Sequence, residues 1–245
     1  MLLCLTGAGI SVAAGLVLPA LFPADAGFET LCVLLALQEI LLIGLPALFI
    51  ALRSPAAIRA LKSLWARPTA FECGLTMLAA VAFTLVSVLI TVMFLALLQS
   101  FGISPPSGGA LVPGSVSQLV IAALCATLIP ALAEELLFRG LVQGWLARRL
   151  SQAAAIWIGA VLFALLHRSL VAFPQILAIG LVLGVLRARS GGLMLPVIFH
   201  AFYNFAVLAL NFSGAVPSLG MMLLCIAVFT LSFRLLTKQE AEDVR

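Results

Sequence analysis

Charged side chains are scarce in this chain of 245 residues, which contains only 13 Lys and Arg, 9 Asp and Glu, and 2 His. Asp, Glu, Lys and Arg together make up 9% of the residues, whereas a soluble domain needs about a quarter to cover its surface. The mean hydropathy is +1.27. These values exclude a water-soluble globular fold, and we expect an integral membrane protein surrounded by membrane lipids.

The sequence also lacks the polar/apolar alternation that is typical of a transmembrane β-strand. Its apolar residues run in stretches of about 20, the length of a membrane-spanning helix. We therefore predict an all-α fold: a polytopic membrane protein of about eight transmembrane helices. These helices are expected near residues 2–22, 30–52, 73–100, 115–149, 153–167, 172–187, 193–211 and 216–236.

Paired cysteines are absent as well. The five cysteines lie in or beside apolar stretches without C-x-x-C spacing, so we expect neither a disulfide framework nor a thiolate metal site. No Lys or Arg precedes the first apolar run, which we interpret as a retained helix and not as a cleaved signal peptide.

The net charge of +4 and the pI near 9.1 reflect membrane orientation and do not indicate a nucleic-acid partner. If eight helices cross the membrane in alternating directions, the basic residues fall in loops on one side of the membrane. The loops on the other side carry Asp25 and Glu29. The positive-inside rule then places both termini in the cytoplasm. The short loops favour a prokaryotic plasma membrane. The basic residues are Arg53, Arg59, Lys62, Arg67, Arg148, Arg149, Arg187, Arg189, Arg234, Lys238 and Arg245.

The whole chain is predicted to form one integral membrane domain without an internal repeat, which counts against inverted-repeat transporters. A loop rich in Pro, Gly and Ser at 101–114 separates strongly apolar helices in the first part of the chain, the front helices, from more polar helices after it. The predicted parts of the domain 1–245 are front helices in 1–110 with a basic interfacial segment at 53–72, a polar block at 115–211 and a last helix at 216–236.

Ionisable residues gather in the polar block, where each is a functional candidate because burying it at bilayer depth is costly. In "EELLFR", Glu135 and Arg139 are four residues apart and are expected to pair on one helix face, which leaves Glu134 free. The only two histidines are His167, in "FALLH", and His200, which precedes Asn204 by one turn in "HAFYN".

These residue types suit the hydrolysis of an acyl bond. A carboxylate and an imidazole can orient a water and take its proton, and a second imidazole with an amide can stabilise the oxyanion. Phe163, one turn before His167, is expected to shape the pocket. Pro130 and Pro196 each precede a polar residue by four positions and are expected to open the helix there.

Three segments, "EELLFR", "FALLH" and "HAFYN", resemble in order the EExxxR, FxxxH and HxxxN motifs of the CAAX prenyl endopeptidase and bacteriocin-processing family, CPBP or Abi. The resemblance covers about residues 115–211 and implies an intramembrane endopeptidase of the glutamate type. It further implies that its active site opens toward the cytoplasm and acts on a peptide or protein with a lipidated or membrane-associated tail. The implied catalytic residues are Glu134 and His167, which activate water, and His200 and Asn204, which stabilise the oxyanion, with Glu135, Arg139 and Phe163 in support.

No cofactor is expected to be required. H-E-x-x-H is absent from the sequence, but a set of two His and one carboxylate (Glu134, His167 and His200) would be the ligands if zinc were bound. The alternative function is a non-catalytic membrane scaffold or bacteriocin immunity protein of the same family. A transporter with carboxylate proton relays is a third hypothesis.

The two histidines are expected at different depths in the membrane. A fifth span of 15 residues rises about 22 Å, while His200 lies about 10 Å from the cytoplasmic end of its span, so a straight bundle does not join His167 to His200. We therefore expect kinked, tilted or re-entrant helices in the second half. Glu39 matches no family motif and is expected to pair with Gln38 or with a neighbouring base.

Overall fold

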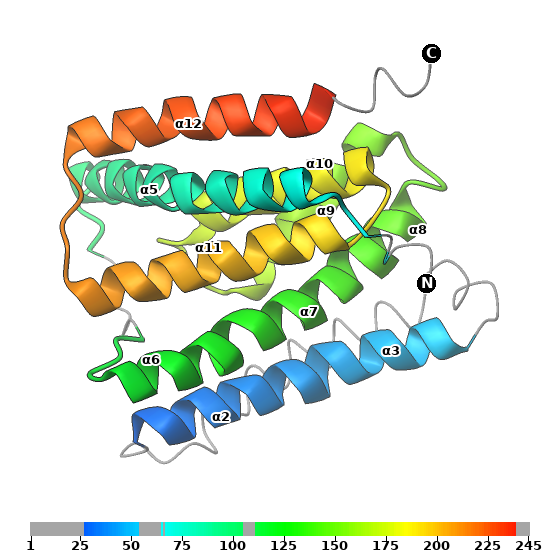
Figure 1. Cartoon of the computed structure of the whole chain (residues 1–245), viewed down its shortest axis with the longest axis horizontal. Coiled ribbons are helices and arrows are strands. Elements are labelled where there is room, and N and C mark those ends of the chain that lie inside the picture. The colour runs from blue at the N-terminus through cyan, green and yellow to red at the C-terminus, as the bar shows by residue number, and fades with distance from the viewer. Residues whose placement is uncertain (1–26, 54–64, 66, 105–110, 239–245) are drawn as a thin grey trace.

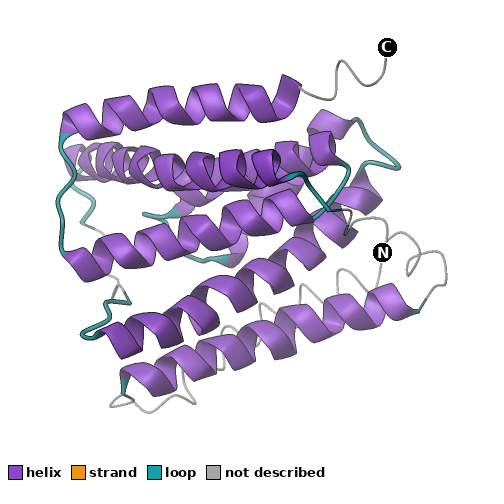
Figure 2. Cartoon of the chain, viewed as in Figure 1, coloured by secondary structure: helices purple, strands orange, loops and turns teal. Residues whose placement is uncertain are grey.

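The computed structural model describes residues 27–53, 65, 67–104 and 111–238 (Figure 1). Within these ranges every regular element is a helix and there is no strand (Figure 2), which confirms the all-α fold class. The predicted first span at 2–22 and most of the interfacial segment at 53–72 lie outside the described residues. The total of eight helices therefore stays a prediction.

The described residues form seven helical runs, which agree within a few residues with the seven spans predicted there. Six are long and apolar enough to cross a membrane, and Gln152–Leu166 is shorter. The elements are α2 (Phe28–Glu39), η1 (Ile40–Gly44) and α3 (Leu45–Leu52); α5 (Ala70–Ser100); α6 (Val116–Ala123), η2 (Leu124–Leu128), α7 (Ile129–Glu135), η3 (Leu136–Gln143) and α8 (Gly144–Leu146); α9 (Gln152–Leu166); α10 (Phe173–Ser190); α11 (Met194–Ser213); and α12 (Leu219–Lys238).

Local signals in the sequence set several helix ends. At the start of α5, the Thr69 side chain accepts a hydrogen bond from the backbone N–H of Glu72, whose carboxylate reaches back to Thr69, forming a capping box. At the start of α9, the Ser151 hydroxyl oxygen accepts a hydrogen bond from the backbone N–H of Ala154. Helices α10 and α11 both end at a glycine with positive φ, a conformation that side chains other than glycine rarely adopt.

Two long helices contain π-helical segments, labelled η. In each, a π-helical stretch comes directly before a short α-helix with proline at its second position, Pro46 in α3 and Pro130 in α7. Because proline lacks the N–H that an α-helix needs, the widened turn accommodates the missing hydrogen bond. The expectation that Pro130 perturbs its helix is confirmed. For Pro196 it is wrong, since that residue lies in the first turn of α11, where the N–H has no helical partner anyway.

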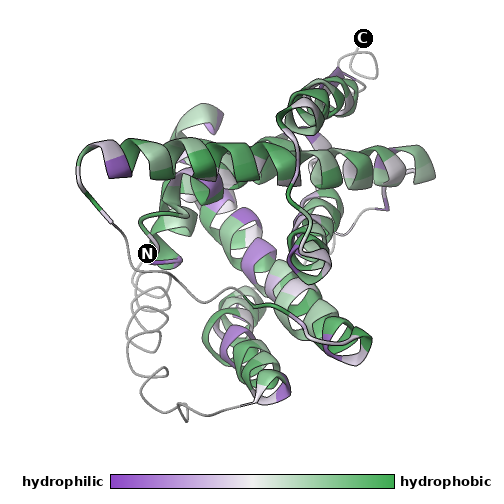
Figure 3. Cartoon of the chain, turned by 90° about the vertical axis from the view of Figure 1, so that its left-hand side faces the viewer, coloured by the Kyte–Doolittle hydropathy of each residue, from purple (hydrophilic) through white to green (hydrophobic). Residues whose placement is uncertain are grey.

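The helices run between two ends of the bundle (Figure 1). We call one the basic end, because Arg53, Arg148, Arg149, Arg189 and Lys238 lie at helix ends there. The opposite end carries the end of α5, the start of α6 and the turn at 214–218 between α11 and α12. Most residues of the helices are apolar (Figure 3), as expected of helices in contact with lipid.

The packing order places the second half of the chain at the centre. Helix α12 packs on α5, α5 packs on α11, and α9 pairs with α10. The run from α6 to α8 crosses obliquely beside α11, and the run from α2 to α3 covers it on the outside (Figure 1). This oblique crossing fits the expected tilt in the second half. This helical run continues to Leu146.

Glycine lets α9 and α10 approach closely. A Cβ at Gly180 would lie 3.1 Å from the Cα and Cβ of Ala160, and one at Gly184 would lie 2.9 Å from a methyl of Ile156. Gly180 and Gly184, four residues apart on α10, therefore allow close packing between the two helices. By contrast, a Cβ built at Gly144 meets nothing within 4 Å.

Candidate active site

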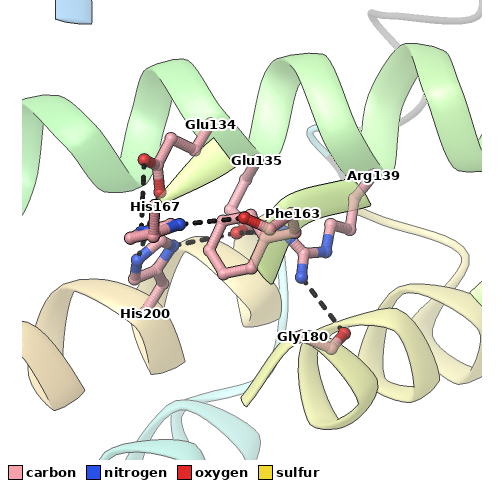
Figure 4. Close-up of polar contacts among 7 residues, drawn as sticks. All are labelled: Glu134, Glu135, Arg139, Phe163, His167, Gly180 and His200. Atoms are coloured by element: carbon pink, nitrogen blue, oxygen red, sulfur yellow. Dashed lines mark hydrogen bonds and ion pairs between the residues drawn. The ribbon is translucent and has the colours of Figure 1, made fainter. Parts of the chain in front are cut away.

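Glu134 and Glu135 end α7 and point to different neighbours (Figure 4). Both are buried, with 7% and 0% of their surface exposed. Glu135 Oε1 lies 2.9 Å from Arg139 Nη1, so the pair predicted from the four-residue spacing is present. The guanidinium also donates from Nη2 to the carbonyl oxygen of Gly180 at 3.1 Å. Arg139 thereby links Glu135, at the end of α7, to α10.

His200 also binds Glu135, which the sequence analysis did not predict. Its Nδ1 lies 2.9 Å from Glu135 Oε1, the oxygen that accepts from Arg139 (Figure 4). On the other side of the ring, Nε2 lies 3.6 Å from Glu134 Oε2. His200 is therefore held between the two glutamates, and 3% of the residue's surface is exposed.

His167 reaches the same carboxylate from the end of α9. Its Nε2 lies 4.0 Å from Glu134 Oε1, and its Nδ1 lies 2.9 Å from the carbonyl oxygen of Phe163 (Figure 4). The side chain is 33% exposed, more than that of His200. The structure thus brings Glu134, His167 and His200 together from three helices, despite the depth difference that a straight bundle would impose.

Phe163 occupies the space between these groups. Its ring packs edge-on against His167, with centroids 4.8 Å apart, and against His200 at 5.8 Å. The guanidinium carbon of Arg139 lies 4.6 Å from the centre of the same ring, which favours a cation there. Phe163 is 1% exposed and so keeps water from this side of the site.

These contacts determine which ring nitrogens carry hydrogen. A carbonyl oxygen only accepts, and so does a carboxylate that is paired with arginine, so Nδ1 is the donor in both histidines. In the neutral rings, Nε2 of His167 and Nε2 of His200 are then acceptors facing Glu134. Several acceptors around one point suit a water molecule, whose two hydrogens need acceptors. For His200 to donate to an oxyanion, its Nε2 must carry a proton, with Glu135 as counter-charge.

A cavity of about 310 Å³ borders both histidines. Asn204 lines it one turn after His200, and no hydrogen bond of its side chain is found among the described residues, so its amide is available to a ligand. The lining continues along α11 through Val207 to Asn211, near the end of that helix, and includes Leu111. The cavity therefore occupies the half of the bundle toward the opposite end, away from the basic end.

Three polar residues at or near this cavity, Gln175, Thr91 and Ser87, were missed by the sequence analysis. Gln175 lines the cavity and accepts a hydrogen bond from the Thr91 hydroxyl at 2.5 Å, and Tyr203 donates to Ser87 at 3.1 Å. Thr91 and Ser87 lie four residues apart on α5, in the front half of the chain. Their one-turn spacing within an apolar run was a readable signal of a polar face, but their partners are more than 80 residues away.

Among the described residues, no three His, Cys, Asp or Glu side chains are arranged to hold a metal ion. The set of Glu134, His167 and His200 named for zinc is thus close together without the geometry of a ligand cage. Hydrolysis without a cofactor stays a prediction.

Comparison with known proteins addresses the family. Residues 116–206 match the family model described as type II CAAX prenyl endopeptidase Rce1-like. The resemblance to CAAX proteases is confirmed. The matched segment begins at the start of α6 and extends into α11, so it contains all three motifs and the residues that meet at Glu134.

A curated relative from Escherichia coli, described as an uncharacterized 24.3 kDa protein, is 31% identical over 93 residues. That alignment spans 35% of this chain and 42% of the relative. No solved structure was found to match the chain. The match to the family model concerns residues 116–206, which we call the Rce1-like block, and the helices before α6 stand outside that match.

Proposed function

We propose that the protein is an intramembrane endopeptidase that hydrolyses a peptide bond near the membrane-proximal or C-terminal part of a lipidated or membrane-associated substrate. The observation that carries this proposal is the convergence of Glu134, His167 and His200 beside a cavity within an otherwise apolar bundle. The Rce1-like match of residues 116–206 supports a protease of the CAAX type. A glutamate-activated water is the mechanism that these contacts favour.

In this mechanism Glu134 and the Nε2 atom of His167 accept the two hydrogens of one water. The water oxygen attacks the carbonyl carbon of the substrate, and its proton passes to Glu134. The amide of Asn204, and Nε2 of His200 when protonated, donate hydrogen bonds to the oxyanion. Glu134 then delivers the proton to the leaving nitrogen as the carbon–nitrogen bond breaks.

The test is substitution of the groups at the site, with cleavage followed by mass spectrometry of membrane proteins from cells that produce each variant. We expect Glu134→Gln, His167→Ala and His200→Ala to abolish the loss of substrate C-terminal fragments. Asn204→Ala should lower the cleavage rate about 10²-fold, the typical cost of one oxyanion donor. All four proteins should still insert into the membrane.

Glu29→Gln is the matched control. Glu29 lies in the first turn of α2 and accepts a hydrogen bond from Gln118 Nε2, which the amide oxygen of glutamine can also accept. It should cleave like the unaltered protein. Full cleavage by all of the site variants would disprove the endopeptidase proposal.

Metal dependence has its own test. We expect EDTA and 1,10-phenanthroline to leave the cleavage rate unchanged within about twofold, because the proposed water activation uses side chains alone. Loss of activity with chelator, restored by added zinc, would instead favour the ligand set Glu134, His167 and His200.

The alternative, a non-catalytic scaffold or immunity protein, is supported by the buried ion pair of Glu135 and Arg139, which can serve helix register alone. It predicts that variants at Glu134 lose stability and partner binding in parallel and that no protein is processed. The cavity that His167 and His200 line favours the enzyme, because a purely structural cluster has no need of an adjacent space.

For location, we propose a prokaryotic plasma membrane with the basic end in the cytoplasm. The expected opening of the active site toward the cytoplasm is harder to reconcile with the cavity. With that orientation, a cavity that reaches Asn211 and Leu111 lies in the half of the bundle away from the cytoplasm.

A further inference from the structure

Gln175 contributes an amide group to the cavity from α10, a helix that carries none of the proposed catalytic residues. It lies in the first turn of α10 and lines the cavity together with His167, His200 and Asn204. Its Oε1 accepts a hydrogen bond from the hydroxyl of Thr91 on α5, at 2.5 Å. No hydrogen bond of the Nε2 group is found among the described residues. Both hydrogens of this group are therefore available to a ligand.

Thr91 belongs to a polar face of α5 that contacts both helices of the cavity. Its hydroxyl lies 3.0 Å from the carbonyl oxygen of Ser87, one turn earlier, so it is also held against its own helix. The Ser87 side chain in turn accepts a hydrogen bond from Tyr203, another residue of the cavity lining. The same face of α5 thus holds a side chain of α10 through Thr91 and one of α11 through Ser87.

Two more amide groups line the cavity from α11. Asn204 and Asn211 are seven residues apart, so they lie on one face of the helix, about 10 Å apart along its axis. No hydrogen bond of either side chain is found among the described residues. An extended peptide rises about 3.3 Å per residue, so this part of the cavity matches the length of about three extended residues.

The lining favours an uncharged ligand that has many hydrogen-bonding groups. Lys, Arg, Asp and Glu are absent from the described residues that line the cavity. A charged group that entered it would lose its hydration without an adjacent counter-charge. A peptide segment unwound from a membrane helix is uncharged, but its backbone N–H and C=O groups have lost their helical partners. Free side-chain amides can replace those partners.

We propose that Gln175 is a substrate-binding residue of the active site and that Thr91 is its positioning residue. The Nε2 group of Gln175 donates a hydrogen bond to a backbone carbonyl oxygen of an unwound, uncharged substrate segment. Thr91 holds the oxygen of the same amide, so the donor is the part left for the substrate. This inference rests on the proposed endopeptidase function. Because the contact is to the backbone, an apolar peptide should bind whatever the order of its side chains.

Peptide binding tests this role without catalysis. The probe is an N-acetylated, C-amidated pentapeptide of alanine and leucine, titrated into full-length Glu134→Gln protein in detergent and followed by microscale thermophoresis. In this background, Gln175→Met should weaken binding about three- to tenfold, the effect of one lost hydrogen bond. A pentapeptide of the same composition in another order should bind equally well. One with a central aspartate should bind at least about tenfold more weakly.

A double-mutant cycle tests whether Thr91 acts through Gln175. Thr91→Val should weaken binding about as much as Gln175→Met, and the two changes together should weaken it no further. Thr91→Ser, which keeps the hydroxyl, should recover most of the affinity that Thr91→Val loses. Thr230→Val is the matched control, because the Thr230 hydroxyl donates to the carbonyl oxygen of Ile226 on the exposed side of α12. It should bind the pentapeptide like the parent.

Absence of binding to the Glu134→Gln protein, or equal binding after Gln175→Met, overturns the proposal. A loss of affinity accompanied by an equal fall in melting temperature, without recovery in Thr91→Ser, indicates a packing role and overturns it too. If Glu134→Gln and His200→Ala still process membrane proteins while peptide binding depends on Gln175, the proposed endopeptidase mechanism has failed and the peptide site stands. If those two variants are inactive while Gln175→Met binds the peptide normally, only the role of Gln175 is wrong.

Discussion

Glu135 has two partners on one oxygen, and this sharing makes it the most tightly held group of the site. Its Oε1 receives both Arg139 and His200, and the residue is fully buried. Removing one member of such a buried set leaves an uncompensated charge, which costs far more than an exposed ion pair is worth. The geometry of His200 therefore depends on Arg139, although the two do not touch in any contact described.

Substitution of Arg139 tests that dependence. Arg139→Ala should lower the free energy of unfolding in detergent by about 3–5 kcal/mol, the usual cost of breaking a buried pair. Arg149→Ala is the control: Arg149 stacks on Trp145 near the exposed basic end and should change stability little. Equal losses in the two variants would contradict the structural role given to Arg139.

At this scale the sequence could predict contacts along one helix but not contacts between helices. The spacing of Glu135 and Arg139 defines their pair, because residues four apart share a helix face. The bond from His200 to the same carboxylate joins residues 65 apart and depends on how α11 lies against α7. No local pattern encodes that relation.

At the scale of elements, the helices were predictable because each apolar run is about as long as a bilayer is thick. The start of α5 was placed three residues late, although the T-x-x-E pattern at Thr69 and Glu72 is a recognised start signal. The π-helical segments have weaker signals. Pro46 and Pro130 mark two of them, whereas nothing comparable marks η3.

The close approach of α9 and α10 depends on the absence of a side chain at Gly180. Gly180→Ala should lower the free energy of unfolding by about 1–3 kcal/mol, because the new Cβ would press on the backbone of Ala160. It should also lower activity, since the Gly180 carbonyl holds Arg139. Unfolding in detergent and the cleavage assay measure the two effects.

Gly144→Ala is the matched control, because Gly144 is also a glycine within a helix. A Cβ there meets nothing within 4 Å, and alanine favours a helix over glycine, so stability should stay the same or rise slightly. A loss as large as that of Gly180→Ala would show that helix packing is not what makes Gly180 sensitive.

For the whole molecule, the side from which the cavity is reached is the main topological question. We expect that a membrane-impermeant maleimide labels Arg149→Cys from the cytoplasmic face, because the basic end should lie there. Asn211→Cys should be labelled from the other face, because the cavity extends toward that end. The measurement uses right-side-out and inverted vesicles of a variant that lacks Cys4, Cys32, Cys73, Cys125 and Cys225.

Labelling of both cysteines from the cytoplasmic face would instead support the cytoplasmic opening that the family resemblance implies. Sequence could not decide this point. Loop charges indicate which end of a bundle faces inward, but the direction in which a cavity extends depends on side chains from several helices.

The π-helical stretches within Val116–Leu146 also affect how this chain should be aligned with relatives. A π turn takes up one more residue than an α turn, so each stretch acts as a one-residue insertion that leaves the helix continuous. Relatives without such a widened turn will need a gap inside this transmembrane helix. Alignments that allow gaps only in loops will put residues on the wrong face beyond that point, even where the glutamates themselves are matched.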